Sequence, residues 1–508
     1  MAKIVVVGAG IGGATTAALL AKRGHEVIVF DQAIVPGGCA STFQRRGYTF
    51  DVGATQVAGL EPGGIHHRIF NELEIDLPPA TECDPACAVF LPGETTPISV
   101  WRDPQRWQAE REQQFPGSEA FWSLLQKLFE ISWQFQSRDP VLPPRNLWDI
   151  GQLLAAVRPD TLLTVPFTLA TVGDALNLLG LGDDRRLRLF LDLQLKLYSQ
   201  VTAAETALLY AATALGVSQA PQGLYHLNGS MQTLVDRLIA ALERDGGKLL
   251  MRHQVTEIQT DSKGMTGVVV TNSKTGQTWV ETADQVIANV PIQNLAQMVT
   301  AKAIDQPTAA KSWGWQNYRR GTAKLPTPSA AFVIYLGVDR SAIPPDCPPH
   351  LQFLYDEQGV IGENNSLFVS VSKEGDGRAP AGRATIIASS FTDPNKWYAP
   401  DADVAAMKAV YTQEAIERLA TFFQLSAESI EVCEAGTPQT FEKFTGRYRG
   451  YVGGVGQRVA TFGPFGIANR TPINGLWLVG DSTHPGEGTA GVSYSALTVV
   501  RQIDATNP

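Results

Sequence analysis

The chain has 508 residues, which is too long for one simple hydrophobic core and predicts two or more domains. Hydrophobic residues make up 44% of it and charged residues 18%, as in globular proteins with a large core. The formal net charge of -9 argues against a nucleic-acid partner, and no run of Lys and Arg would bind an anionic membrane by charge alone.

Cysteine usage and the absence of long apolar segments indicate the compartment. Five scattered cysteines suit a reducing environment, and neither the close pair Cys83 and Cys87 nor the adjacent His66 and His67 has further ligands at metal-site spacing. The chain enters a strand directly after Met-Ala-Lys, without a signal-peptide pattern. The uncharged stretch 161–173 is shorter than the roughly 20 residues of a spanning helix. We therefore expect a cytoplasmic protein that holds no metal and does not cross a membrane.

The beginning of the chain has the order strand, glycine loop, helix, strand, acid. KIVVV (3–7) is a β-branched run typical of a buried parallel strand, and GAGIGG (8–13) follows it. ATTAALLAKRG (14–24) predicts a helix, and EVIVFD (26–31) predicts a second strand that ends in Asp31. This order predicts a Rossmann-like dinucleotide-binding unit.

Each glycine of this loop has a physical role. Gly8 allows a tight turn, Gly10 lets the backbone approach a pyrophosphate, and Gly13 lets the helix pack on the strand. The helix start offers unpaired amides, while Asp31 can accept hydrogen bonds from a ribose diol. The candidate cofactor residues of this unit are Gly8, Gly10, Ile11, Gly12, Gly13 and Asp31.

A second glycine loop indicates which dinucleotide binds. PGGCASTFQRRGYTFDVGA (36–54) carries Gly37 and Gly38 within seven residues of Asp31, and a basic hairpin-like stretch then leads to Gly53. A simple NAD domain would continue into another helix. A second loop so close to the ribose acid suits a cofactor that extends past its pyrophosphate, as FAD does, and adds Gly37, Gly38 and Gly53 to the candidate FAD-binding residues.

From GYTFDVGAT (47–55) onward the sequence resembles the FAD-dependent carotenoid desaturase and isomerase family, within the flavin amine oxidase superfamily. The resemblance covers nearly the full length. It implies an α/β fold with a discontinuous FAD-binding domain formed by residues 1–75, 225–300 and 440–508. An inserted α+β substrate domain with a helical cap would be formed by residues 76–224 and 301–439.

The middle of the chain supplies a further predicted cofactor contact. An amphipathic helix is predicted over 229–244, a strand over KLLMRHQVTEI (248–258), a hairpin with a Lys-Thr-Gly turn, and a strand over 285–288. In the resembled family, a backbone group of the residue that matches Val255 contacts the adenine.

The proposed insertions are rich in Trp, Phe, Leu and Pro. FWSLLQKLFEISWQF (121–135) has helical spacing and predicts a helical cap with its own core. Part of this apolar surface could also admit a hydrocarbon substrate and rest on a membrane, and the two interpretations are compatible. WGWQNYRRG (313–321) is expected to be a rim patch or a loop.

INGLWLVGD (473–481) predicts a strand that ends in Gly480 and Asp481 at the ligand-binding edge of the sheet. The resemblance implies that this Gly-Asp pair contacts the pyrophosphate and ribityl part of FAD. A helix predicted to begin near Ala490 would point the amides around Gly491 and Val492 at the flavin pyrimidine and stabilise negative charge there.

Between them, THPG (483–486) is similar to carotenoid desaturases, whereas IVPGGCASTF (34–43) and GYTFDVGA (47–54) are closer to carotene isomerases. His484 is the candidate catalytic residue because an imidazole of near-neutral pKa can relay a proton. The alternative is a structural histidine. The neighbouring Glu487 is a weaker catalytic candidate, because an apolar substrate has no polar group with which a carboxylate could interact.

The resemblance implies hydride transfer from a carotenoid C–C bond to flavin N5, at the C-3′,4′ bond of a monocyclic or hydroxylated carotene. The alternatives are a carotene cis–trans isomerase that uses reduced FAD, and a flavin amine oxidase or a noncatalytic FAD-binding protein. The expected partners are the carotenoid, quinone or oxygen as electron acceptor, and a membrane contacted peripherally.

Overall fold

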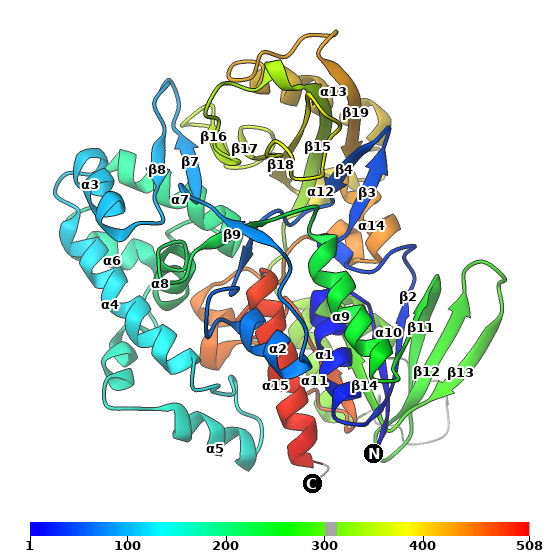
Figure 1. Ribbon diagram of the computed structural model, residues 1–508. Coiled ribbons are helices and arrows are strands. Elements are labelled where there is room, and N and C mark those ends of the chain that lie inside the picture. Colours follow the sequence, from blue (N-terminus) through cyan, green and yellow to red (C-terminus); the bar gives the residue numbers. More distant parts are fainter. Residues whose placement is uncertain (300–311, 507–508) are drawn as a thin grey trace.

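A parallel sheet with the strand order β10-β2-β1-β14-β20 forms the centre of one half of the computed structural model, which describes residues 1–299 and 312–506 (Figure 1). All neighbouring strands in it run parallel. Ile4 and Val6 of the central strand face one layer, Val5 and Val7 face the other, and all four are buried, because successive side chains of a strand alternate. The strands are β1 (Lys3–Val7), β2 (Glu26–Asp31), β10 (Lys248–Met251), β14 (Gln285–Ala288) and β20 (Leu476–Leu478).

Helices cover the Ile4 face of this sheet. Figure 1 shows α15, near the end of the chain, lying beside α1 and α2, near its beginning. These helices are α1 (Ile11–Lys22), α2 (Ile65–Leu73), α9 (Gln232–Arg244) and α15 (Thr489–Thr506). The Val5 face packs on an antiparallel sheet and on helices α10 and α11. Their bounds are β11 (His253–Thr260), β12 (Met265–Asn272), β13 (Thr278–Thr282), α10 (Ile292–Met298) and α11 (Trp313–Ala323).

Three local predictions differ from the structure. The stretch 248–258 forms two strands in different sheets, because Arg252 has the left-handed φ of 62° and turns the chain away from β2. The stretch 313–321 is not a loop but lies in α11, whose start is capped by the Ser312 hydroxyl. The amphipathic helix begins at Gln232, because Gly229 has a φ of 86° and lies before the helix.

A second sheet has the strand order β19-β15-β18-β17-β16-β7-β8. One face packs against α13 (Val404–Leu419) and the short α12 (Pro394–Trp397), while the other contacts α14 (Pro438–Thr445) and a hairpin of strands β3 (Thr42–Arg45) and β4 (Tyr48–Asp51). The strands of the sheet are β7 (Cys87–Phe90), β8 (Ile98–Val100), β15 (Ala330–Asp339), β16 (His350–Leu354), β17 (Ser366–Val371), β18 (Arg383–Thr392) and β19 (Ile430–Gly436). Between the two halves, β9 (Leu224–Leu227) pairs with β5 (Val57–Ala58) and β6 (Ala80–Glu82).

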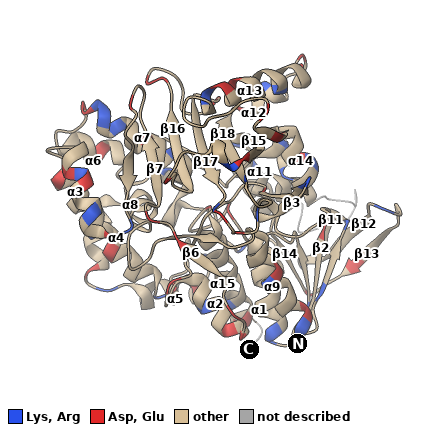
Figure 2. Cartoon of the chain, turned by 45° about the horizontal axis from the view of Figure 1, so that its top comes forward, with Lys and Arg blue, Asp and Glu red and all other residues tan. Residues whose placement is uncertain are grey.

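A group of helices beside the second sheet has its own hydrophobic core, as the spacing of residues 121–135 predicts. Acidic and basic residues alternate on the outer surface, for example on α3 and α13 (Figure 2). Within the described ranges, no helix combines the length and the apolar character that crossing a bilayer requires. The helices of the group are α3 (Pro104–Gln114), α4 (Glu119–Gln136), α5 (Leu147–Ala156), α6 (Val172–Leu178), α7 (Arg185–Ser199) and α8 (Leu208–Gly216), with the 3-10 helix η2 (Thr161–Phe167).

Candidate functional site

A cavity of about 1270 Å³ lies where the two glycine loops, the second sheet and the helix group meet. It is larger than the roughly 300–1,000 Å³ of a pocket for one drug-sized ligand. Of the candidate residues, Gly13 alone does not line it. Those that do are Gly8, Gly10, Ile11, Gly12, Asp31, Gly37, Gly38, Gly53, Val255, Gly480, Asp481, His484, Gly491 and Val492.

The first glycine loop forms one wall of the cavity. Gly8 has a φ of 97°, and Gly10 is the N-cap residue of α1. Gly10 and Gly37 form a parallel β-bridge, so the two N-terminal glycine loops lie side by side. A Cβ on Gly13 would lie 2.0 Å from the Gly8 carbonyl oxygen. Gly13 therefore supports the turn by close packing beneath it.

Asp31, at the end of β2, is held in a fixed orientation beside this loop. Its Oδ2 accepts a hydrogen bond of 2.7 Å from the Ala9 amide, and its Oδ1 accepts one of 2.7 Å from the Ala33 amide. Each carboxylate oxygen has a second lone-pair site. Asp31 thus retains acceptor capacity toward a diol in the cavity.

Two residues that the sequence motifs do not single out hold the walls of the cavity: Asn289 contacts the first glycine loop, and Arg447 binds Asp481 on the opposite wall. Asn289 follows β14 and donates to the Gly8 carbonyl oxygen at 3.3 Å. Arg447 donates to Asp481 Oδ2 at 2.7 Å and comes from the chain after α14. The stretch ANVP contains Asn289, but nothing local in the sequence singles out Arg447. Its role depends on a contact between residues distant along the chain.

These elements fit FAD. Both α1 and α15 begin at the cavity, and the first amides of a helix have no acceptor within the helix, so they suit a pyrophosphate and a developing negative charge. The glycines at positions 8, 10, 12, 37 and 38 line the cavity, and a Cβ at Gly8 would lie 2.7 Å from the Asn289 carbonyl oxygen, so close packing of the wall requires glycine there.

His484 faces the cavity within an aromatic surrounding. Its ring centroid lies 5.6 Å from that of Phe462 and 6.5 Å from that of Tyr494. Neither ring nitrogen has a hydrogen-bond partner within residues 1–299 and 312–506. Burial lowers the pKa of His484 to about 4. The expected near-neutral pKa is therefore wrong, because no neighbouring group stabilises the charged ring.

Glu487, three residues further along, is a second buried titratable group of this wall. Burial raises its pKa to about 8, although the Gln200 hydrogen bond acts in the opposite direction. At neutral pH the cavity thus presents an uncharged imidazole and an uncharged acid. The same wall also carries the ion pair of Asp481 and Arg447.

The far part of the cavity is apolar. Its wall is formed by side chains of the helix group and its linkers, among them Trp133, Phe135, Leu142, Leu153, Leu197 and Leu209. The segment from α5 through η2 both lines the cavity and exposes apolar side chains to solvent. The exposed fractions are 86% for Leu147, 67% for Leu154, 55% for Leu163 and 61% for Val165.

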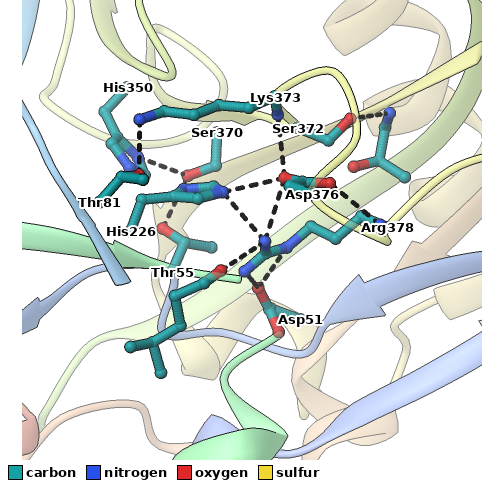
Figure 3. A network of polar contacts seen from close by, with 12 residues as sticks. Asp51, Thr55, Thr81, His226, His350, Ser370, Ser372, Lys373, Asp376 and Arg378 are labelled. Atoms are coloured by element: carbon teal, nitrogen blue, oxygen red, sulfur yellow. Dashed lines mark hydrogen bonds and ion pairs between the residues drawn. The ribbon is translucent and has the colours of Figure 1, made fainter. Parts of the chain in front are cut away.

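A buried ionic network fixes the hairpin of β3 and β4 against the second sheet (Figure 3). Arg378 binds Asp51 at 3.0 Å and Asp376 at 3.1 Å, and His226 lies 3.0 Å from Asp376. Burial by itself would raise the pKa of Asp376, yet the His226 hydrogen bond and the Arg378 charge hold it below its ordinary value. The network lies close behind Thr55, a cavity-lining residue that accepts a bond of 2.6 Å from Ser370.

The comparisons with known proteins agree with this geometry. Residues 11–504 match the family described as flavin containing amine oxidoreductase. The chain is 28% identical over 516 residues to prolycopene isomerase 2, chloroplastic, of an Oncidium hybrid cultivar, in an alignment that covers 99% of this chain and 83% of that protein. It is 23% identical over 511 residues to the 4,4'-diapophytoene desaturase (4,4'-diapolycopene-forming) of Methylomonas sp, in an alignment that covers 97% of this chain and 93% of that protein.

Among solved structures, an oxidoreductase from Methanosarcina mazei has a TM-score of 0.63 at 18% identity, covering 98% of this chain and 100% of that chain. At this identity the likeness concerns the fold alone, and it confirms the predicted α/β architecture. The matched family, which spans nearly all of the chain, confirms the flavin cofactor. This chain belongs to the family of flavin containing amine oxidoreductases and has FAD as its cofactor.

Proposed function

We propose that the chain is an FAD-dependent carotenoid desaturase that dehydrogenates a C–C bond, the C-3′,4′ bond of a monocyclic or hydroxylated carotene. The observation that carries this proposal is the cavity, which joins both glycine loops to an apolar region beneath the helix group. A cavity that holds a long hydrocarbon along its length fixes the orientation of the reacting bond. A fixed orientation lowers the activation barrier of the reaction. The carotenoid desaturase of Methylomonas sp among the relatives supports the substrate class.

When bound, FAD supplies the hydride acceptor of the reaction. In this proposal Gly8, Gly10 and Asp481 bind the cofactor, and Val255 contacts its adenine. The helix group excludes water from the reacting bond. In this proposal the cofactor-binding domain comprises 1–75, 225–300 and 440–508, and the substrate domain comprises 76–224 and 301–439, of which positions 300–311 and 507–508 lie outside the described residues. Quinone or oxygen then reoxidises the flavin.

His484 is the proposed acceptor of the proton that leaves with the hydride, because the residue lines the cavity and neither of its buried ring nitrogens has a hydrogen-bond partner among the described residues. A His484→Phe variant should keep its FAD and lose about 10²- to 10⁴-fold in desaturation rate. Flavin absorbance measures the bound FAD, and carotenoid chromatography measures the desaturation rate. Full retained activity would assign His484 a structural role.

The reaction is tested by incubating the holoenzyme with a monocyclic and a hydroxylated carotene. Loss of two hydrogens with a longer chromophore supports desaturation. Consumption of amines with peroxide formation would instead identify an amine oxidase.

The second candidate is a carotene cis–trans isomerase with reduced FAD. The observation in its favour is the 28% identity to a prolycopene isomerase along 99% of this chain. Isomerisation changes the absorption spectrum of the product without changing its mass, so mass spectrometry of the same incubation separates the two candidates.

We further propose that the segment from α5 through η2 rests on a lipid surface, through which the carotenoid enters the cavity. It combines exposed leucines with cavity-lining ones, as a peripheral contact requires. Leu154→Asp together with Leu163→Asp should lower binding to phosphatidylcholine vesicles at least about tenfold in flotation, by the loss of apolar burial. Val410→Asp, at a position 54% exposed on α13, is the control. Equal losses of vesicle binding in the double variant and in Val410→Asp would contradict the proposal that this segment rests on a lipid surface.

A further inference from the structure

Two half-buried side chains of the cavity wall, Gln56 and Tyr198, carry oxygen atoms without a hydrogen-bond partner. Gln56 follows Gly53, Tyr198 lies near the end of α7, and both line the cavity. Within residues 1–299 and 312–506, neither the Tyr198 hydroxyl nor Gln56 Oε1 forms a hydrogen bond. Neither of them belongs to the fully enclosed polar atoms that lack a partner, so each retains accessible surface. A molecule in the cavity can therefore contact both oxygens.

The Gln56 amide has a fixed orientation. Its Nε2 donates a hydrogen bond of 2.8 Å to the Ala86 carbonyl oxygen, which can only accept. Nε2 must therefore face Ala86, and Oε1 is the atom that is left for a ligand. The Tyr198 hydroxyl can donate as well as accept. Together the two side chains offer one acceptor and one donor, which is the set that a hydroxyl group needs.

Tyr198 faces strand β7 and not the cofactor wall of residues 480–492. Burial, and then the thiols of Cys87 and Cys83, raise the pKa of its hydroxyl, so the hydroxyl lies beside these thiols. Among the described residues, no titratable group of the wall 480–492 acts on it. Gln194, one turn earlier on the same face of α7, also acts on the Cys87 thiol. This face of α7 is therefore turned toward β7.

Gln56 reaches the same place from the other side of the cavity wall. It donates to the carbonyl of Ala86, the residue before β7, and its side chain also acts on the Cys83 thiol. The cavity extends to this point, because the cavity-lining Leu224 accepts the Cys83 amide at 2.9 Å through its carbonyl oxygen. Gln56 and Tyr198 thus share the thiol of Cys83 as a neighbour.

We propose that Gln56 and Tyr198 form a subsite for a hydroxyl group of the bound carotenoid. The Tyr198 O–H donates a hydrogen bond to the oxygen of this hydroxyl, and the hydroxyl donates to Gln56 Oε1. The inference rests on the proposed function and selects a hydroxylated carotene as its substrate. A pure hydrocarbon removes water from both groups and gives them no partner in return, whereas a hydroxylated end group satisfies both.

The test compares two carotenoids with the same skeleton, one with a hydroxyl on its end group and one without, in the holoenzyme. In Tyr198→Phe and in Gln56→Leu, the ratio of kcat/KM for the hydroxylated over the hydrocarbon substrate should fall about tenfold. Tyr355→Phe removes a buried hydroxyl without a partner, at a position that does not line the cavity, and should leave the ratio unchanged. An unchanged ratio in either Tyr198→Phe or Gln56→Leu would overturn the proposed pair.

A merely structural role of Tyr198 predicts a different result. Because its hydroxyl forms no hydrogen bond within the described residues, Tyr198→Phe should keep the melting temperature and the flavin spectrum of the wild type. Equal losses of kcat/KM on both substrates, together with a lower melting temperature or a changed flavin spectrum, would show that the hydroxyl supports the fold or the cofactor. That result would overturn the proposal.

If the wild type desaturates neither compound, the proposed function fails, and binding then tests the subsite independently. Quenching of tryptophan fluorescence by the two carotenoids should show tighter binding of the hydroxylated one to the wild type. The double variant Tyr198→Phe with Gln56→Leu should show no such preference. Equal affinities of the wild type for the two carotenoids would reject the subsite by itself.

Discussion

Gly13 shows at the scale of one residue how closely the cofactor loop is packed. A Cβ at this position would lie 2.0 Å from the Gly8 carbonyl oxygen and 3.0 Å from Asn289 Nδ2. Gly13→Ala must therefore displace α1 or the turn, which overpacking studies place at a cost of about 1–3 kcal/mol or more. We expect a lower melting temperature and a lower flavin content in the purified protein.

Gly151→Ala is the matched control for this change. Gly151 also lies in a helix, α5, and a Cβ there meets no atom within 4 Å. The substitution should stabilise the protein by up to about 1 kcal/mol through helix propensity. Equal melting temperatures of the two variants would contradict the packing role of Gly13.

At the scale of elements, the contact between β4 and the loop after β17 depends on Arg378. Its guanidinium is 2% exposed and binds Asp51 and Asp376, while Asp51 Oδ1 also accepts the Met231 amide at the start of α9. Arg378→Met leaves two buried carboxyl groups without their cation and should cost about 3–5 kcal/mol, measured by urea unfolding.

Arg383 provides the comparison for Arg378. It binds Asp339 and Glu431 from a side chain that is 35% exposed. Such pairs contribute about 0–1 kcal/mol, so Arg383→Met should change the stability little. A loss for Arg378→Met as small as that for Arg383→Met would mean that the buried network does not hold the hairpin.

At the scale of the whole molecule, buried titratable groups couple stability to pH in opposite directions. The folded-state pKa of His484 is about 4, below the unfolded value near 6.5, so the unfolded chain binds the proton first as the pH falls. Its contribution to stability is lost below about pH 6.5. Glu487, with its raised pKa of about 8, has the opposite effect, because its contribution is present at low pH and is lost as the pH rises toward 8.

The difference in the pH dependence of stability between the wild type and His484→Phe isolates the contribution of His484. His484→Phe removes the titrating ring without removing a hydrogen bond, while Glu487 remains in both proteins. Between pH 7 and pH 5 the wild type should lose about 2 kcal/mol of unfolding free energy relative to the variant. Urea unfolding at the two pH values measures this difference, and parallel pH dependence would show that His484 is not buried in its neutral form.

The sequence by itself determined the elements whose signals are local. The order of strand, glycine loop, helix and acid over residues 3–31 predicted β1, α1 and β2, because β-branched runs, helical spacing and glycine turns act within a few residues. The second glycine loop and the Gly480–Asp481 strand end likewise predicted cavity-lining residues. The FAD cofactor followed from the spacing of these signals.

Only the tertiary structure decided the contacts between distant residues. Arg447 reaches Asp481, Gln200 orients Glu487, and Arg378 binds Asp51 across 327 positions of sequence. No periodicity encodes such pairs, because they form only when separate elements pack together. Burial then set the charge states that composition could not show, lowering the pKa of His484 to about 4 and raising that of Glu487 to about 8.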